Sequence, residues 1–252
     1  MKKIFSILVV LVAPGAFAAG GSSEFIEHFT PDTTNKASLQ RGARLFVNYC
    51  MSCHSAGYHR YTHLARDLYL SEKQVQENLI FTTDEHGVPT KPGELMVVPM
   101  TEKYAKEAFG TVPPNLSLVS RVRGASWLYS YLKGFYLDES REPIGVNNTV
   151  FPDVGMPHVL WELQGFQIPV YKTEARNGKE IRSIERLEIA VPGEQSPEEY
   201  AVTAADLVNF LVYLGEPARL ERQRLGIWIV LFLVVFTIIA YFLKREYWRD
   251  VH

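Results

Sequence analysis

The two cysteines of this 252-residue chain lie in one short stretch, Cys50-Met51-Ser52-Cys53-His54. A Cys-x-x-Cys-His sequence is the attachment motif of a c-type haem. Residues three apart share a face of a helical turn, so both sulfurs can reach the vinyl groups on one haem edge. His54 follows directly and can offer a neutral imidazole nitrogen to the iron. The stretch therefore predicts a covalently attached haem c with His54 as an axial ligand.

Two other chemistries use paired cysteines, and both fit this chain less well. A structural zinc site needs four ligands, and the chain contains no second cysteine pair. A thioredoxin-like redox pair is expected beside a βαβ pattern, which the sequence does not show. Because the haem uses both cysteines, no disulfide within the chain remains to stabilise the fold.

The second axial position of the iron has several candidate ligands. Met156 lies in Val154-Gly155-Met156-Pro157-His158, where glycine and proline can hold a side chain in a fixed position. A buried methionine is more often a core residue, but a methionine–histidine pair raises the haem potential and suits electron transfer. We therefore favour Met156 and retain, in order, His158 and then Met96 and Met100.

The helix that positions the motif is predicted over Ser38 to Tyr49, with Ser38 as its N-cap. Gly42, Phe46 and Cys50 recur at i, i+4 and i+8 and therefore lie on one face that leads into the haem. A glycine on that face lets a second helix approach closely, and Phe46 can pack beside the haem ring.

A second helix is predicted over Ala204 to Leu214. Its pairing with the first is implied by the resemblance to c-type cytochromes, in which the first and last helices of the domain cross near the haem. Thr203 and Asp206 have the spacing of a capping box, and the apolar residues between 207 and 214 recur at helical spacing. The remaining elements are predicted as helices over Glu72–Leu79, Glu102–Phe109 and Ala125–Lys133 and a hairpin within Lys172–Val191.

Both ends of the chain have membrane-directed features. Lys2 and Lys3, the apolar run Ile4–Val12 and Ala16-Phe17-Ala18 together predict a secretory signal peptide cleaved after Ala18. Leu225–Leu243 contains no charged residue, and its length of roughly 28 Å as a helix matches the hydrocarbon core of a bilayer. Basic residues flank this segment on both sides, so the signal peptide decides the orientation.

The sequence thus predicts a signal peptide at 1–18, a periplasmic domain at 19–221, a single membrane anchor with its flanks at 222–246 and a cytoplasmic tail at 247–252. This layout places the protein in a bacterial inner membrane, with the haem domain on the periplasmic side. A formal net charge of −2 gives no reason to expect nucleic acid as a partner.

Pro113-Pro114-Asn115-Leu116-Ser117 predicts a turn that leads toward Arg121 and Arg123. Haem propionates are anionic and need a cation or hydrogen-bond donors when they are buried. An arginine here can meet that need, and from spacing alone a solvated helix arginine is an equal alternative.

Four motifs together resemble the cytochrome c1 family, the haem subunits of ubiquinol–cytochrome c reductase (the cytochrome bc1 complex). They are Cys50-x-x-Cys53-His54-Ser55 continuing to Tyr58, Tyr61, His63 and Leu64; the turn at 113–117 with Arg121 and Arg123; Gly155-Met156-Pro157; and Glu216-Pro217 with Arg222, Arg224 and Gly226. Asn115 stands where the family often has Asp, and Tyr213 where Trp is common. Residues Gly165 to Pro197 match no family feature.

The resemblance implies a mainly α fold: a c-type cytochrome domain with long loop insertions and one C-terminal transmembrane helix. It implies that Cys50 and Cys53 form the thioethers, that His54 and Met156 bind the iron, and that Arg123 pairs with a propionate. The implied donor is the Rieske iron–sulfur subunit, the acceptor is a periplasmic c-type cytochrome, and cytochrome b is the third partner. The chain would be the electron-transfer subunit of the reductase and perform no bond chemistry itself.

Three rival functions also use a haem c. A stand-alone, membrane-anchored c-type carrier usually joins its anchor to the haem domain by a flexible linker, whereas only Glu216 to Arg224 separate the two here. The haem c subunit of a terminal oxidase or nitric oxide reductase usually has its anchor at the N-terminus. A haem-based ligand sensor would need an open or displaceable sixth site on the iron.

Overall fold

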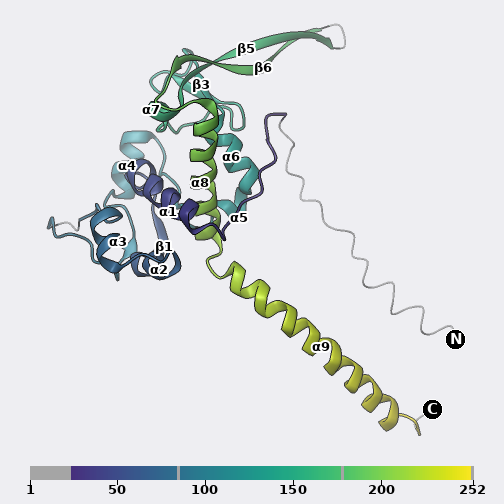
Figure 1. Ribbon diagram of the computed structural model, residues 1–252. Helices are drawn as coiled ribbons and strands as arrows, with labels where there is room; N and C mark the ends of the chain where they lie inside the picture. Colours follow the sequence, from purple (N-terminus) through teal and green to yellow (C-terminus); the bar gives the residue numbers. More distant parts are fainter. Residues whose placement is uncertain (1–23, 84–85, 177–178, 251–252) are drawn as a thin grey trace.

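Two helices that are far apart in the sequence, α1 (Lys36–Leu45) and α8 (Pro197–Gly215), cross and pack against each other at the centre of the molecule (Figure 1). The computed structural model describes residues 24–83, 86–176 and 179–250. The predicted pairing of the first and last helices of the domain is confirmed, and the predicted signal peptide at 1–18 lies outside the described residues.

The fold is mainly helical, as predicted, with three antiparallel sheets of two strands each among the described residues. Between the two central helices the elements run in the order η2 (Phe46–Cys50), β1 (Ala56–Arg60), α2 (Tyr61–Asp67), α3 (Glu72–Asn78), β2 (Leu95–Met96), α4 (Glu102–Phe109), η3 (Leu116–Leu118), α5 (Val119–Arg123), α6 (Ala125–Lys133), β3 (Phe135–Leu137), β4 (Val146–Asn148), α7 (Trp161–Gln164), β5 (Gly165–Arg176) and β6 (Lys179–Pro192). The three short helices predicted from the sequence are confirmed as α3, α4 and α6.

The helix that leads into the cysteine motif begins earlier than predicted and changes its winding. Asn35, not Ser38, is the N-cap, and its side chain accepts a hydrogen bond from the Ser38 amide. The predicted single helix is α-helical to Leu45 and continues as one π-helical stretch, η2, which ends at Cys50. The extra residue in a π turn rotates the chain just before the motif, a feature that π-bulges often show at functional sites.

The start of α8 was predicted wrongly. The helix begins at Pro197 with a capping box formed by Ser196 and Glu199, so Thr203 and Asp206 lie inside it. The Asp206 carboxylate instead meets Arg41 Nε at 2.5 Å and accepts a hydrogen bond from Ser38 Oγ at 2.6 Å, both on α1. Asp206 therefore makes a polar contact between the central helices and does not mark a helix start.

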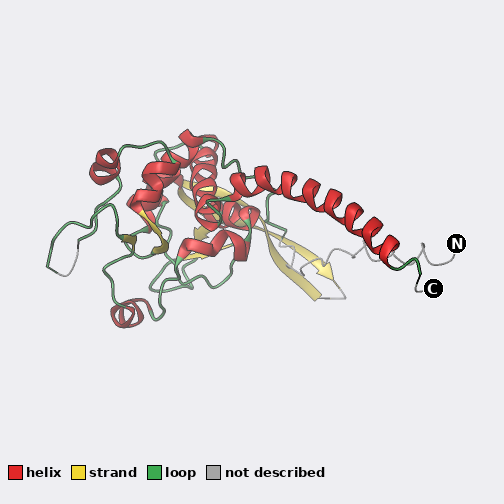
Figure 2. Ribbon diagram, turned by 90° about the horizontal axis from the view of Figure 1, so that it is seen from below, coloured by secondary structure: helices red, strands yellow, loops and turns green. Residues whose placement is uncertain are grey.

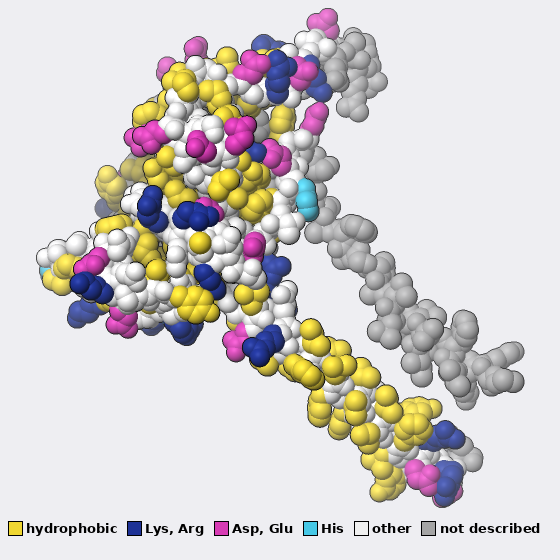
Figure 3. Space-filling view, in the orientation of Figure 1, with side chains coloured by type: hydrophobic (Ala, Val, Ile, Leu, Met, Phe, Trp, Pro, Cys, Tyr) yellow, Lys and Arg dark blue, Asp and Glu magenta, His cyan; other side chains and the backbone are white. Residues whose placement is uncertain are grey.

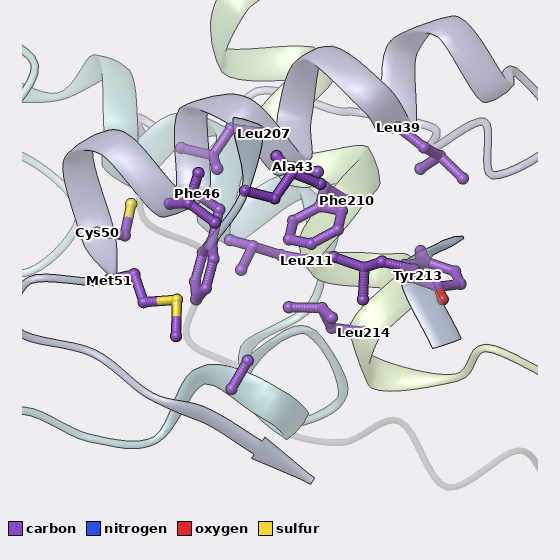
Figure 4. Close-up of a cluster of buried hydrophobic side chains, with 14 of the residues drawn as sticks. Leu39, Ala43, Phe46, Cys50, Met51, Leu207, Phe210, Leu211, Tyr213 and Leu214 are labelled. Carbon is purple, nitrogen blue, oxygen red and sulfur yellow. The ribbon is translucent and has the colours of Figure 1, made fainter. Parts of the chain in front are cut away.

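Gly42 sets how closely the central helices approach. A Cβ atom at this position would lie 2.2 Å from the Asp206 carbonyl oxygen and 2.6 Å from Phe210 Cβ. The predicted contact face is confirmed: Phe46 is fully buried, with its ring centroid 5.6 Å from that of Phe210. Figure 4 shows the buried side chains of the two helices together, with Cys50 and Met51 at one end of the cluster.

We expect Gly42→Ala to lower the free energy of unfolding by about 2 kcal/mol or more, because overpacking against backbone outweighs the better helix propensity of alanine. Thermal unfolding of the haem-loaded protein measures the effect. Gly226→Ala is the matched control, since a Cβ there meets no atom within 4 Å. An unchanged melting temperature for Gly42→Ala would mean that the helices do not approach this closely.

The stretch at 165–197, which matched no family feature, forms a long hairpin. Strands β5 and β6 pair antiparallel from Gly165 with Pro192 to Arg176 with Lys179, so the hairpin is longer than the one predicted within Lys172–Val191. Figure 2 shows it projecting from the helical body. This insertion is therefore an ordered arm rather than a loop.

The C-terminal helix α9 (Arg219–Tyr247) extends away from the domain, so the molecule as a whole is elongated (Figure 1). Among the described residues it is the single helix long and apolar enough to cross a membrane. Figure 3 shows a continuous hydrophobic surface along its length, with charged side chains gathered at the two ends. This is the pattern expected for a helix surrounded by lipid.

Candidate haem-binding site

The cysteine motif forms a tight turn at the end of η2. The amides of Cys53 and His54 both donate to the Cys50 carbonyl oxygen, at 3.1 and 2.8 Å. Both cysteines are free thiols, as thioether formation requires, and Cys50 is buried while Cys53 is partly exposed. Burial raises the pKa of the Cys50 thiol to about 12. The predicted attachment residues are thus brought together on one turn that also presents His54.

The imidazole of His54 is oriented by a backbone carbonyl. Its Nδ1 lies 2.8 Å from the Pro114 carbonyl oxygen, so Nδ1 carries the proton and donates, and Nε2 retains a free lone pair. Burial lowers the pKa of His54 and favours the neutral ring. This is the arrangement that fixes a metal-binding histidine in one tautomer and orientation.

The turn at 113–117 has a second role that the sequence did not reveal: it supports the segment after the motif. The Leu116 amide donates to the Ser55 carbonyl oxygen at 2.8 Å, and the Tyr58 amide donates to Ser117 Oγ at 3.1 Å. Asn115 caps η3 by accepting a hydrogen bond from the Ser117 amide, a role that an Asp could also fill. The departure from the family at Asn115 therefore leaves the turn intact.

Met156 follows a loop that is organised by buried asparagines. Asn147 Oδ1 accepts a hydrogen bond from the Asp153 amide, and Asn148 Oδ1 accepts one from the Val150 amide, both at 2.9 Å. Arg141 Nη2 donates to the Val154 carbonyl oxygen at 3.0 Å. These contacts fix the chain just before Met156, so its position does not depend on Gly155 and Pro157 alone.

The Met156 side chain packs in a small cluster with Phe135, Val146 and Val154. Tyr131 also packs against this cluster, and its hydroxyl donates a hydrogen bond to Met156 Sδ at 3.4 Å. Tyr131 packs as well against the larger core that contains Cys50. Tyr131 therefore lies between the cluster that holds Met156 and the larger core to which Cys50 belongs.

The alternative sixth ligands lie in different surroundings. His158 is 6% exposed, stacks on Phe135 with ring centroids 4.9 Å apart, and has no hydrogen-bond partner at Nε2. Burial lowers its pKa to about 4, so the ring is neutral and chemically able to bind iron. Met96 is fully buried on β2 in the larger core, and Met100 is partly exposed. Met156 remains the prediction, with His158 as its alternative.

Arg123 lies at the end of α5, with its guanidinium 4.9 Å from the Trp127 ring centroid and 5.5 Å from that of Phe151. Within the described part of the chain it has no carboxylate partner, whereas Arg121 lies 3.5 Å from a Glu216 oxygen. An arginine held by aromatic rings without a counter-ion is suited to an anionic ligand. Its predicted pairing with a propionate stays a prediction.

The donor set fits a haem c. Two free thiols, a neutral imidazole with an oriented free nitrogen and a thioether sulfur are the groups that such a haem uses. When bound, the haem supplies one-electron chemistry, in which the iron alternates between ferrous and ferric states. Cys50 and Cys53 would hold its edge, and His54 would bind the iron.

A family model and several known proteins match this chain. The model of the cytochrome C1 family matches residues 26–251. The chain is 46% identical to cytochrome c1 of Allochromatium vinosum over the full length of both proteins. It is 42% identical to a Nitrosomonas europaea protein named ammonia monooxygenase gamma subunit, covering 98% of each chain. It also matches cytochrome b/c1 of Bradyrhizobium diazoefficiens at 25% identity, over its whole length and 41% of that longer protein.

The attachment turn, the oriented histidine and the apolar anchor agree with the family match. The family accounts for the covalent haem c and for association with a membrane, for which α9 is the candidate span. The chain belongs to the cytochrome c1 family and is a haem c electron carrier of the cytochrome bc1 complex.

Proposed function

We propose that this chain accepts single electrons from the Rieske iron–sulfur subunit and passes them to a c-type cytochrome in the periplasm. The observation that carries the proposal is the attachment turn with His54, whose Nδ1 is held by the Pro114 carbonyl oxygen at 2.8 Å. A fixed imidazole keeps the iron environment similar in both oxidation states, and a site that need not rearrange suits repeated one-electron transfer.

In this proposal the side chains have separate roles. Cys50 and Cys53 hold the haem covalently, so it is retained through many redox cycles. His54 and Met156 are the axial ligands, and the thioether sulfur favours the ferrous state and a high potential. Arg123, held over Trp127 and Phe151, neutralises a propionate. None of these residues moves a proton or forms a bond to a substrate.

The connection between the domain and its anchor supports a fixed subunit rather than a tethered shuttle. Only Glu216, Pro217 and Ala218 separate α8 from α9. The Glu216 carboxylate accepts a hydrogen bond from Arg222 Nε at 2.5 Å and lies 3.5 Å from Arg121 on α5. Arg222 lowers the pKa of Glu216, which therefore stays charged. The anchor is thus tied to α5, the helix that ends at Arg123.

The proposed topology follows the sequence prediction: a signal peptide at 1–18, a periplasmic haem domain at 19–221, an anchor at 222–246 and a cytoplasmic tail at 247–252. Cytochrome b and the Rieske protein are the subunits with which the domain would assemble in the bacterial inner membrane. The match to part of a longer protein named cytochrome b/c1 supports cytochrome b as a neighbour. Protease added to intact spheroplasts should digest the haem domain, and its protection would contradict this orientation.

The electron path is tested by isolating the tagged chain from membranes in mild detergent. We expect a reduced-minus-oxidised spectrum with bands of both b-type and c-type haem, and inhibitor-sensitive reduction of a periplasmic cytochrome c by quinol. Removal of the Rieske subunit from the same preparation should leave both haem bands and stop the activity. A c-type band alone, after extraction that keeps complexes intact, would favour the stand-alone carrier.

A further inference from the structure

We infer that the end of the haem domain from which α9 leaves lies on the lipid headgroups, with Tyr69, Lys36 and Arg66 in contact with anionic phospholipid. The inference goes beyond the electron path and depends on α9 as the membrane span. Its basis is an exposed aromatic side chain at a backbone position that suits glycine, next to a lysine and close to the start of the anchor.

Tyr69 follows the last turn of α2 in a left-handed backbone conformation, with a φ of +56°. The Leu70 amide donates to the Ala65 carbonyl oxygen at 2.9 Å, so Tyr69 occupies the position that is usually glycine in a Schellman motif. A bulky residue is locally unfavourable at this φ. The residue is 79% exposed, so burial within the domain does not offset the strain. The position therefore indicates a contact outside the chain.

One cation lies over the Tyr69 ring, and a second precedes Tyr69 by three residues. Lys36 Nζ is 5.7 Å from the ring centroid, and within the described part of the chain no carboxylate pairs with it. The Arg66 side chain is 72% exposed and binds the Asp67 carboxylate at 2.7 Å. An exposed tyrosine beside basic groups is typical of a protein surface at the membrane–water interface.

The end of α2 lies beside the start of the anchor. The Tyr213 hydroxyl, in the last turn of α8, donates to Asp67 Oδ2 at 2.8 Å, and three residues then connect α8 to α9. Asp67 raises the pKa of Arg66 most strongly, and the charge of Glu221 in the first turn of α9 raises it further. Figure 1 shows α2 at the end of the domain from which α9 leaves.

The length of helix before the membrane span places this surface at the depth of the headgroups. Glu221 precedes the uncharged segment Leu225–Leu243 by four residues, about 6 Å of helix. The headgroup layer on each side of a bilayer is roughly 5–8 Å deep. Arg219 and Arg224 add basic groups at the same level, and Figure 3 shows Lys and Arg side chains along this end of the domain. Basic groups at this depth attract anionic lipid.

The test is photo-crosslinking in the intact complex, reconstituted in nanodiscs of equal parts phosphatidylcholine and phosphatidylglycerol. With p-benzoylphenylalanine at position 69, mass spectrometry should find phospholipid adducts in which phosphatidylglycerol exceeds its share of the lipid roughly twofold to fivefold. Combining Lys36→Gln with Arg66→Gln should return that ratio to the share of the lipid.

The same probe at position 104 is the matched control. Tyr104 is a second exposed tyrosine, at 61%, and it belongs to α4. Figure 1 shows α4 on the side of the domain away from α9, so no lipid adduct is expected there. Adducts with cytochrome b or another subunit at position 69, or equal lipid adducts at positions 69 and 104, would overturn the inference.

Tyr69→Gly tests the same inference without a crosslinker. In non-ionic detergent it should raise the melting temperature of the haem domain by about 2–4 °C, because glycine relieves the left-handed strain. In the nanodiscs the gain should be smaller, since the headgroup contact is lost as well. A lower melting temperature in detergent would show that the ring is needed for packing inside the domain, and the inference would fail.

A probe at position 232 separates the inference from its premise. Phe232 is 66% exposed and lies within the uncharged segment of α9. Lipid adducts at position 232 without any at position 69 reject the headgroup contact and leave the anchor intact. If position 232 gives no lipid adduct either, α9 is not the span, and the proposed topology fails together with the headgroup contact.

Discussion

Replacing both Cys50 and Cys53 with alanine abolishes covalent haem attachment, and either single replacement leaves at most one thioether. The physical reason is that the two sulfurs lie on one tight turn closed on the Cys50 carbonyl oxygen, and the chain has no other cysteine to take their place. Haem staining after denaturing electrophoresis measures attachment. The pyridine haemochrome spectrum reports a remaining vinyl group in each single variant through a red shift of its α band.

Ser52→Ala is the control for this prediction, because it alters the same turn at an exposed position and leaves both thiols in place. We expect its haem content and haemochrome spectrum to equal those of the unmodified protein. Haem that resists extraction from the double cysteine variant would contradict the assignment of the attachment site.

Replacing Met156 with alanine leaves the haem attached but lowers its midpoint potential by about 100 mV or more, since axial ligands set haem potentials over roughly 0.8 V. The Met156 sulfur that stabilises the ferrous state is lost, while the covalent links from Cys50 and Cys53 and the bond from His54 to the iron are unchanged. Quinol-dependent reduction of cytochrome c should then stop, because the haem can no longer accept an electron from the donor. Redox titration and steady-state activity measure the two effects.

His158→Phe provides the comparison, because the aromatic ring keeps the stack on Phe135 and removes the unpartnered Nε2. If Met156 is the ligand, this variant retains its potential and its ferric charge-transfer band. A normal potential in Met156→Ala together with a lowered one in His158→Phe would transfer the ligand role to His158.

Much of the site could be predicted from the sequence because it depends on local geometry. The cysteines and His54 lie within five consecutive residues, and a single turn is enough to bring them together. Segments such as α4 and α6 were predicted with their exact bounds because Thr101 supplies an N-cap and Gly110 and Gly134 follow the last turns. The membrane span was evident for the same reason: it requires only a continuous apolar helix.

The contacts that orient the ligands could not be predicted, because they join residues distant in sequence through groups without a sequence pattern. Every residue has a backbone carbonyl, so nothing marked Pro114 as the partner of His54, 60 residues away. Likewise, nothing in the sequence linked Tyr131 to Met156. Asp206 is a second example of a contact that the sequence could not reveal. Its spacing from Thr203 fits a helix start, and only the packing of α8 on α1 shows that Asp206 pairs with Arg41.

By itself, then, the sequence determined the chemistry of this protein, a covalently bound haem c, and predicted His54 as an iron ligand and a C-terminal helix as the membrane anchor. The tertiary structure decided how these residues are held: Gly42 lets α1 and α8 pack closely, the Pro114 carbonyl oxygen orients His54, and the Tyr131 hydroxyl contacts Met156. The physical reason is one of range. Attachment and membrane insertion depend on residues adjacent in the chain, whereas the orientation of a ligand depends on which distant groups the packed core brings within hydrogen-bonding distance.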